Sequence, residues 1–315
     1  MSPEVAKYWV ALLFRWQINP RKLFLKSWRK ISIMPKIRWK NGARCAVCLT
    51  FDVDGESLWI SRDPHLAHRP IHNAMGAYGP KVGVPRIIKL LKKYSLPGTF
   101  FLPSWTAEKW PKMTEAIMKG GYEIGHHGHL HEKPFQLADA EREEELLIRA
   151  LEILERLTGQ KPTGSRTPSC DPSVHTMDLL KKHGLLYHSN LMDDDSPYYH
   201  PCGLVELPTK WTLDDFIFFG FSGSPPFGHG VRDAESVYSM WVEEFEGTYE
   251  EGGYINFMCH PQVIGQHHRI RMVERLIKHI LEKGDCWFAT TGQVARHWAR
   301  QVKPPKGLPK KRSKK

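Results

Sequence analysis

Two aspartates one residue apart follow an apolar run near residue 50. The apolar run at residues 46–49 leads through Thr50 and Phe51 to Asp52 and Asp54, which are followed by Gly55. Residues i and i+2 of a strand point to the same side, so both carboxylates are expected to share one pocket at the end of a buried strand. Like charges this close resist joint ionisation unless a cation or a proton lies between them. The pair therefore predicts a site that binds a cation or moves a proton.

A second group of residues that could take part in chemistry is the histidine-rich segment at residues 126–131. His127 and His131 are four residues apart, and on a helical turn this spacing would place both imidazoles within reach of one ion. Together with one aspartate of the earlier pair they form a set of two imidazoles and one carboxylate. Such a set leaves coordination positions open for water, which is typical of catalytic rather than structural zinc sites. The alternative is a polar loop that holds no metal.

Strands that alternate with helices must position these residues. Apolar runs predict strands at 45–51, 99–102, 122–125, 163–168, 185–190, 205–208, 254–260 and 286–290. Helical spacing and end signals predict helices from residue 84 to the Pro97 break and at 111–119, 138–157, 173–182, 233–250 and 268–282. A long loop is expected at 57–82 and a Gly/Pro-rich linker at 220–230.

The alternation of strands and helices gives seven or eight β/α units, so the fold class is α/β with parallel strands. The strands are mostly apolar, which favours a closed or distorted barrel over an open doubly wound sheet. In such barrels the chemistry takes place at the carboxyl ends of the strands. Asp52, Asp54, Arg166, Asn190 and His260 each lie at the end of a predicted strand or just after it, as does the histidine pair. We therefore expect these side chains to converge on one rim.

The net charge of +11 in a chain of 315 residues is located in its two ends. Residues 1–40 contain ten Lys or Arg and one acid, and residues 301–315 contain seven Lys or Arg and no acid. The residues between hold 28 basic and 33 acidic side chains. Solvated, disordered ends are the plain interpretation, and a weak attraction to an anionic membrane surface through the N-terminal extension is the alternative. We predict no specific nucleic-acid partner.

The cysteines and the apolar segments indicate in which cellular compartment the protein is expected. Cys45 and Cys48 form a C-x-x-C within a strand-like run, with no second pair at zinc-ribbon spacing, so buried apolar positions are expected for them. Cys170 and Cys259 each lie close to a predicted site residue, and free thiols there fit a cytoplasmic enzyme better than an exported one. No segment reaches the ~18–20 apolar residues of a membrane span, and residues 8–14 make a poor signal peptide.

Four segments of the chain resemble, in order, the polysaccharide deacetylase family (carbohydrate esterase family 4), and the similarity extends over about residues 36–300. They are Thr50-Phe51-Asp52-Val53-Asp54-Gly55, His127-Gly128-His129-Leu130-His131, Arg166-Thr167-Pro168 and His260-Pro261. The branch that looks closest holds intracellular peptidoglycan-deacetylase-like and allantoinase-like proteins. The resemblance implies one domain with a distorted (β/α)7 barrel, between a basic and aromatic extension (1–35) and a basic tail (301–315). It also implies a homo-oligomer, in the form of a tetramer.

The resemblance implies that Asp54, His127 and His131 are the ligands of a divalent metal. Zinc is favoured, and cobalt, nickel and ferrous iron suit the same ligands. Such a metal lowers the pKa of bound water towards ~7 and polarises an amide carbonyl.

Three further residues receive catalytic roles from the resemblance. Asp52 resembles the general base, and His260 resembles the general acid that protonates the leaving amine. Arg166 would hold a carboxylate and so orient the base, and a structural ion pair is the alternative. The strand after Arg166 lacks the Asp-x-x-x-Trp element of exported sugar deacetylases, so Asp214 or Asp215 is the expected carboxylate partner of Arg166.

Substrate binding is expected from Trp105, Pro168, Trp211, Asp214 and Asp215. The aromatic stretch at 211–221 could stack a sugar ring or close a small pocket around a compact amide. Packing in the core is the alternative for any one of these aromatic residues.

The sequence thus predicts a metal-dependent hydrolase of non-peptide C–N amide bonds. N-deacetylation of a peptidoglycan-type polysaccharide or its fragments is the favoured reaction. The alternative enzymatic activity is that of an allantoinase-like hydrolase of ureides or small amides. The alternative of another class is a carbohydrate-binding module without catalysis.

Overall fold

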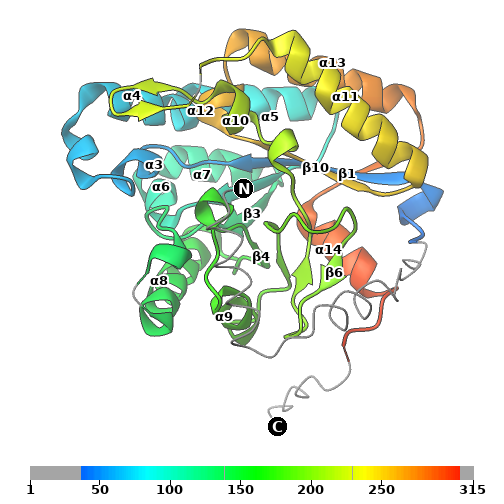
Figure 1. The fold of residues 1–315 in the computed structure, drawn as a ribbon, viewed down its shortest axis with the longest axis horizontal. Helices are drawn as coiled ribbons and strands as arrows, with labels where there is room; N and C mark the ends of the chain where they lie inside the picture. The colour runs from blue at the N-terminus through cyan, green and yellow to red at the C-terminus, as the bar shows by residue number, and fades with distance from the viewer. Residues whose placement is uncertain (1–36, 138, 229, 306–315) are drawn as a thin grey trace, which may run out of the picture. The chain divides into compact units, whose positions relative to one another are not determined.

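The computed structural model describes residues 37–137, 139–228 and 230–305 (Figure 1). The predicted extension at 1–35 and the part of the predicted tail from residue 306 onwards lie outside the described residues. Among the helices of these ranges, none is both long enough and apolar enough to cross a bilayer.

The strands are short, apart from β1 and β10. They are β1 (Cys45–Asp52), β2 (Thr99–Leu102), β3 (Glu123–His126), β4 (Gly164–Ser165), β5 (Tyr187–His188), β6 (Tyr198–Tyr199), β7 (Val205–Glu206), β8 (Ser222–Gly223), β9 (Pro226–Phe227), β10 (Tyr254–Cys259) and β11 (Cys286–Ala289).

Seven parallel strands lie side by side in the order β10-β1-β2-β3-β4-β5-β7, and β6 pairs antiparallel with β7 at the edge. The first half of β1 pairs in addition with β11. A parallel bridge between Asp214 and Met258 links the segment after β7 back to β10. The sheet therefore curls round on itself as a distorted (β/α)7 barrel in one domain, which confirms the prediction of the fold class.

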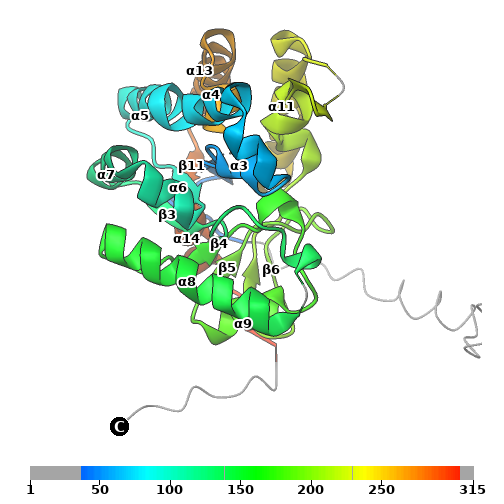
Figure 2. The same ribbon diagram turned by 90° about the vertical axis from the view of Figure 1, so that its left-hand side faces the viewer.

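The helices lie around this sheet (Figures 1 and 2). They are α3 (Ser57–Ile60), α4 (Pro70–Tyr78), α5 (Val84–Lys93), α6 (Ser104–Lys109), α7 (Pro111–Lys119), α8 (Ala140–Thr158), α9 (Thr176–Lys182), α10 (Asp215–Phe219), α11 (Ala234–Glu251), α12 (Pro261–Ile264), α13 (His267–Glu282) and α14 (Thr291–Ala299). Short single turns occur at η1 (Lys40–Gly42), η2 (Pro64–His68), η4 (Pro134–Gln136), η5 (Pro168–Cys170) and η6 (Trp211–Leu213), and η3 (Gly79–Gly83) is a π-helix.

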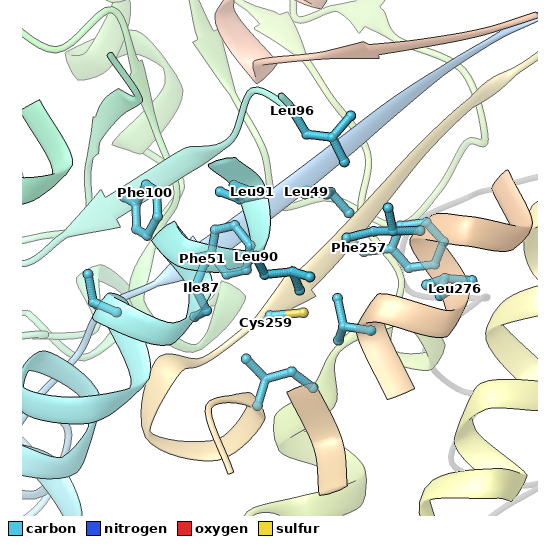
Figure 3. Packing of buried hydrophobic residues seen from close by; sticks show 14 of the residues in the cluster. Leu49, Phe51, Ile87, Leu90, Leu91, Leu96, Phe100, Phe257, Cys259 and Leu276 are labelled. Carbon is cyan, nitrogen blue, oxygen red and sulfur yellow. The ribbon is translucent and has the colours of Figure 1, made fainter. Parts of the chain in front are cut away.

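Strand β1 lies at the centre of the hydrophobic core, and all eight of its residues are buried. The odd-numbered residues from Cys45 to Phe51 pack towards α5 and α13, with Phe257 and Leu276 among their neighbours (Figure 3). Ala46 and Cys48 pack on the opposite side, against α14. Burial on both faces explains why the strand is an unbroken apolar run rather than an alternating one. It also bears out the expectation that Cys45 and Cys48 are buried free thiols.

Several regions differ from the sequence prediction. The segment 57–82, predicted as a loop, is largely helical and contains α3, η2, α4 and η3. Its helices are stabilised by tertiary packing against α12 rather than by an apolar period of their own, so the segment carries no helical signal that could be recognised in advance. The predicted linker at 220–230 contains the β8–β9 hairpin, and β6 was not predicted.

Candidate metal centre and active site

Three predicted ligands meet beyond the carboxyl ends of β1 and β3. The Nε2 atoms of His127 and His131 lie 3.4 and 3.6 Å from Oδ1 of Asp54. All three side chains are buried, and Oδ1 of Asp54 accepts no hydrogen bond within the described part of the chain. Two imidazoles and a carboxylate whose ligand atoms lie within 4.8 Å of one another form a donor set that suits a divalent metal.

The local structure that brings the two histidines together is not the predicted helical turn. Residues 127–132 form an irregular bend after β3, in which Gly128 and His131 adopt left-handed backbone conformations with φ of +76° and +58°. The backbone N–H of His127 donates to the carbonyl of Leu102 and anchors the start of the bend to β2. The two imidazoles therefore converge through a reversal of the backbone, and not through helical spacing.

Neighbouring groups orient the ligand atoms. Nδ1 of His127 lies 2.8 Å from the carbonyl oxygen of Arg166, which can only accept, so Nδ1 carries the proton and the lone pair of Nε2 faces Asp54. Nε2 of Gln262 donates to Oδ2 of Asp54 at 3.1 Å and leaves Oδ1 to the histidines. These contacts fix the ring of His127 and the carboxylate of Asp54 in a metal-binding orientation.

The protonation states also suit a cation. Burial raises the pKa of Asp54, but the neighbouring imidazoles of His131, His127 and His260 outweigh this effect and hold that pKa well below its usual range. Burial lowers the pKa of His131 to about 4. At neutral pH Asp54 is therefore a carboxylate and His131 a neutral imidazole, the forms in which both residue types bind metals.

Asp52 lies at the end of β1, where its carboxylate is held by Arg166. Nη1 of Arg166 donates to Oδ1 of Asp52 at 2.7 Å and to the hydroxyl of Thr50 at 2.9 Å. The remainder of the guanidinium is held by Ser189, through its carbonyl and its hydroxyl, and the group lies over the ring of Phe101. Burial lowers the pKa of Arg166, but the charge of Asp52 outweighs it and raises that pKa.

His260 follows β10 and faces the same centre from the opposite wall. Its Nδ1 lies 2.7 Å from Oδ1 of Asp215, and its Nε2 lies 3.9 Å from Oδ2 of Asp54. Burial lowers the pKa of His260, but the charge of Asp214 and the hydrogen bond to Asp215 outweigh it and raise that pKa well above its usual value. The raised pKa favours the imidazolium form of His260, in which Nε2 carries a proton that points into the site.

The structure corrects the roles expected of Asp214 and Asp215. Neither pairs with Arg166, whose carboxylate partner is Asp52. Asp215 is fully buried and accepts hydrogen bonds from the backbone and the ring of His260, so it is not available to a substrate. Asp214 is 4% exposed, and its Oδ1 accepts from the backbone of Phe216 at the start of α10. Burial raises the pKa of Asp214 to about 7.

The other predicted substrate-binding residues lie in different surroundings. Pro168 is buried at the start of η5, where a Cβ on Gly128 would lie 3.2 Å from its ring. Trp105 is half-buried on α6, with Nζ of Lys109 4.8 Å from its ring centroid. Trp211 is 44% exposed in η6. Their contact with a substrate stays a prediction.

At this centre, sequence reasoning missed Gln262 and named Phe216 only as part of the aromatic stretch at 211–221. Gln262 contacts Asp54, and the ring of Phe216 packs edge-on against that of His260 with centroids 4.9 Å apart. Both lie within four residues of predicted site residues, and this nearness was the available signal. Glu56, by contrast, points away from the centre and binds Trp110 and Lys109.

A second buried group supports the strand ends that hold Arg166. Oε2 of Glu206 lies 2.9 Å from Nδ1 of His188 and 2.7 Å from Nε2 of His200. Oε1 of Glu206 accepts from the backbone N–H groups of Asn190 and Leu191. These are ordinary hydrogen-bond distances, and both carboxylate oxygens are engaged. The group therefore fixes the segment after β5, which carries Ser189 and so Arg166.

Comparison with known proteins gives consistent matches. The family model for polysaccharide deacetylase matches residues 77–188. A peptidoglycan deacetylase of Helicobacter pylori is 32% identical over 273 residues, which cover 78% of this chain and 92% of the relative. The crystal structure of a protein assigned as a polysaccharide deacetylase from Mycobacterium smegmatis superposes with a TM-score of 0.83 at 36% identity and covers 87% of this chain and 97% of its own. The structure of PuuE allantoinase, at 24% identity and a TM-score of 0.75, covers 85% of this chain and 95% of its own and shares the fold.

Proposed function

This chain belongs to the polysaccharide deacetylase family, and from that premise we propose that it removes N-acetyl groups from peptidoglycan-type amino sugars. It is a metal-dependent hydrolase of non-peptide C–N amide bonds. The observation that carries the proposal is the meeting of Asp54, His127 and His131 between a buried acid–base pair, Asp52 on one side and His260 on the other.

Asp54, His127 and His131 would hold the metal, which supplies Lewis acidity for the amide carbonyl and a lowered pKa for water when bound. Zinc is our proposal for its identity, with cobalt, nickel and ferrous iron as the metals to compare, because the donor set suits all four.

Asp52 takes the proton of the attacking water. Its Oδ1 is engaged by Arg166, and its Oδ2 accepts no hydrogen bond from the described residues, so Oδ2 is the oxygen available for proton transfer. The hydrogen bond from Arg166 also fixes the direction of the Asp52 carboxylate, which a general base requires. Arg166 is therefore a positioning residue for the base.

His260 gives the proton on Nε2 to the leaving amine. Asp215 holds Nδ1 on the far side of the ring, which fixes the direction of Nε2 and stabilises the imidazolium. Phe216 covers one side of the ring and limits its contact with water. The base and the acid thus face one amide from opposite walls of the site.

The experiment that tests the proposal measures acetate release from N-acetylglucosamine oligomers by the zinc-loaded protein. Ring opening of allantoin and hydrolysis of formamide are measured in parallel, because the allantoinase-like alternative predicts turnover there instead. Asp52→Asn separates the enzyme from a carbohydrate-binding module: it should abolish acetate release while oligosaccharide binding stays nearly unchanged. Acetate release that survives this substitution would contradict the role of Asp52.

The homo-oligomeric state, the cytoplasmic location and the weak membrane-surface contact expected from the sequence stay predictions. Light scattering, cell fractionation and vesicle binding would test them.

A further inference from the structure

A pocket of about 520 Å³ lies beside the catalytic groups, among residues of α3, α4, α10, α12 and α13. Figure 1 shows α4, α10 and α12 next to one another on one side of the sheet. Much of the pocket wall is apolar and includes Trp59, Met75, Phe216, Phe219 and Phe221. This surface suits an apolar body or the C–H face of a ring.

The pocket borders the reaction centre through two of its lining residues. Gln262 lines the pocket and also donates to Asp54. Phe216 lines the pocket and packs against the ring of His260. A substituent next to the reacting amide can therefore extend into this pocket.

Arg269 lines the same pocket and is only 4% exposed. Its Nη1 donates to the carbonyl of Val263, and its guanidinium lies over the ring of Phe219 at 4.6 Å. The charge of buried Asp215 acts on Arg269 from a distance and opposes the effect of burial on its pKa, but no carboxylate of the described residues forms an ion pair with Arg269, and its buried Nε has no acceptor among them. Buried arginines are almost always paired, so this one is suited to an anionic partner from outside the chain.

The hydrogen bonds of Arg269 leave one nitrogen of its guanidinium for an anion in the pocket. Nη1 is engaged by Val263 and Nε is covered by protein atoms, so Nη2 is the nitrogen that a carboxylate in the pocket can contact through a charge-assisted hydrogen bond. Two other lining residues, Trp59 and Gln262, each carry a buried polar atom without a partner in the described ranges, Nε1 and Oε1 respectively. One can donate and the other can accept, which suits a ligand with polar groups on an apolar frame.

We propose that this pocket binds a carboxylate carried on an apolar or ring-shaped part of the substrate, with Arg269 as its ion-pair partner. The inference rests on the proposed amide hydrolysis at the neighbouring centre and names its substrate class. That class is an N-acylated amine whose amine side bears an acidic substituent, such as an acidic amino sugar.

The test uses 3-phenylpropionate and its uncharged amide, 3-phenylpropanamide, as probes for the zinc-loaded protein. Isothermal titration is expected to show at least tenfold tighter binding of the acid. Arg269→Gln should remove this preference. Ala74→Phe adds bulk at an exposed helix position that lines the pocket and should weaken both probes at least tenfold. Ile71→Phe is the matched control, because Ile71 is exposed on the same helix and does not line the pocket.

Equal affinity of the two probes in the unmodified protein would overturn the proposal. So would a preference for the acid that persists in both Arg269→Gln and Ala74→Phe, because the carboxylate would then bind at the metal. These binding measurements do not depend on catalytic turnover. A protein that binds the acid as expected but releases acetate from no amide would contradict the proposed function and leave the pocket assignment intact.

Discussion

Asp215 holds His260 at two points, because its Oδ1 lies 2.9 Å from the backbone nitrogen of His260 and 2.7 Å from Nδ1 of its ring. The two residues are 45 positions apart in the chain, and both are buried. The contact joins the start of α10 to the end of β10. It gives the proposed general acid a fixed direction and a raised pKa at the same time.

Asp215→Asn is expected to lower kcat by about 10²-fold, because the imidazolium loses its counter-charge and its fixed orientation. His260 must be protonated to act, and its pKa is raised in the folded protein, so activity is lost as pH rises through that pKa. The substitution lowers the pKa and should move the alkaline limb of the kcat profile to lower pH. Asp233→Asn, at an exposed helix cap, is the control. An alkaline limb that stays in place would contradict this role of Asp215.

The ion pair of Arg166 and Asp52 is buried on both sides, with side-chain exposures of 0 and 3%. Arg166→Met leaves the Asp52 charge unpaired, and we expect it to cost about 3–5 kcal/mol of unfolding free energy and most of the activity. The double variant Arg166→Met with Asp52→Asn should recover part of the stability and none of the activity. Urea unfolding and acetate release measure the two effects. Additive losses of stability in the double variant would show that the pair is not coupled.

Glu206 should make the stability of the fold sensitive to acid. Burial raises its pKa, but the charge of His188 and the hydrogen bonds from His188 and His200 outweigh it and hold the pKa well below its usual 4.5. A carboxyl group whose pKa is lower in the folded than in the unfolded protein stabilises the fold at pH values above its unfolded pKa. This contribution to stability is lost as the pH falls through the pKa of the folded protein.

Glu206→Gln is therefore expected to cost about 3–5 kcal/mol at pH 7. The difference in unfolding free energy between Glu206→Gln and the unmodified protein should shrink as the pH falls below about 4.5, the usual pKa of a glutamate side chain. Urea unfolding across pH 3–7 gives the comparison, and a difference that does not depend on pH would count against the assignment.

Gly83 permits the close approach of η3 to the segment after His260. A Cβ at this position would lie 2.1 Å from the carbonyl oxygen of Pro261. Gly83→Ala should cost about 1–3 kcal/mol and lower kcat by displacing His260 and Gln262. Gly247→Ala is the matched control, because a Cβ there meets nothing within 4 Å and alanine favours the interior of α11. Thermal unfolding and acetate release distinguish the two variants.

The sequence was most informative where a side chain follows a strand directly. Asp52, Asp54, Arg166 and His260 could be placed on one rim because parallel strands present their carboxyl ends together. The link from Asp215 to His260 could not be predicted, because it depends on how two distant segments pack. The bend at 127–132 and the helices within 57–82 were missed for a related reason: their conformations are stabilised by neighbouring elements and have no period of their own.

The central claim is that Asp54, His127 and His131 hold the metal on which amide hydrolysis depends. The most direct measurement titrates metal-stripped protein with zinc and follows bound metal per chain together with acetate release from N-acetylglucosamine oligomers. We expect one tightly bound zinc per chain, activity that rises in proportion to it, and loss of both in His131→Ala but not in Ile71→Ala at an exposed site. Full acetate release by the metal-free protein would contradict the account.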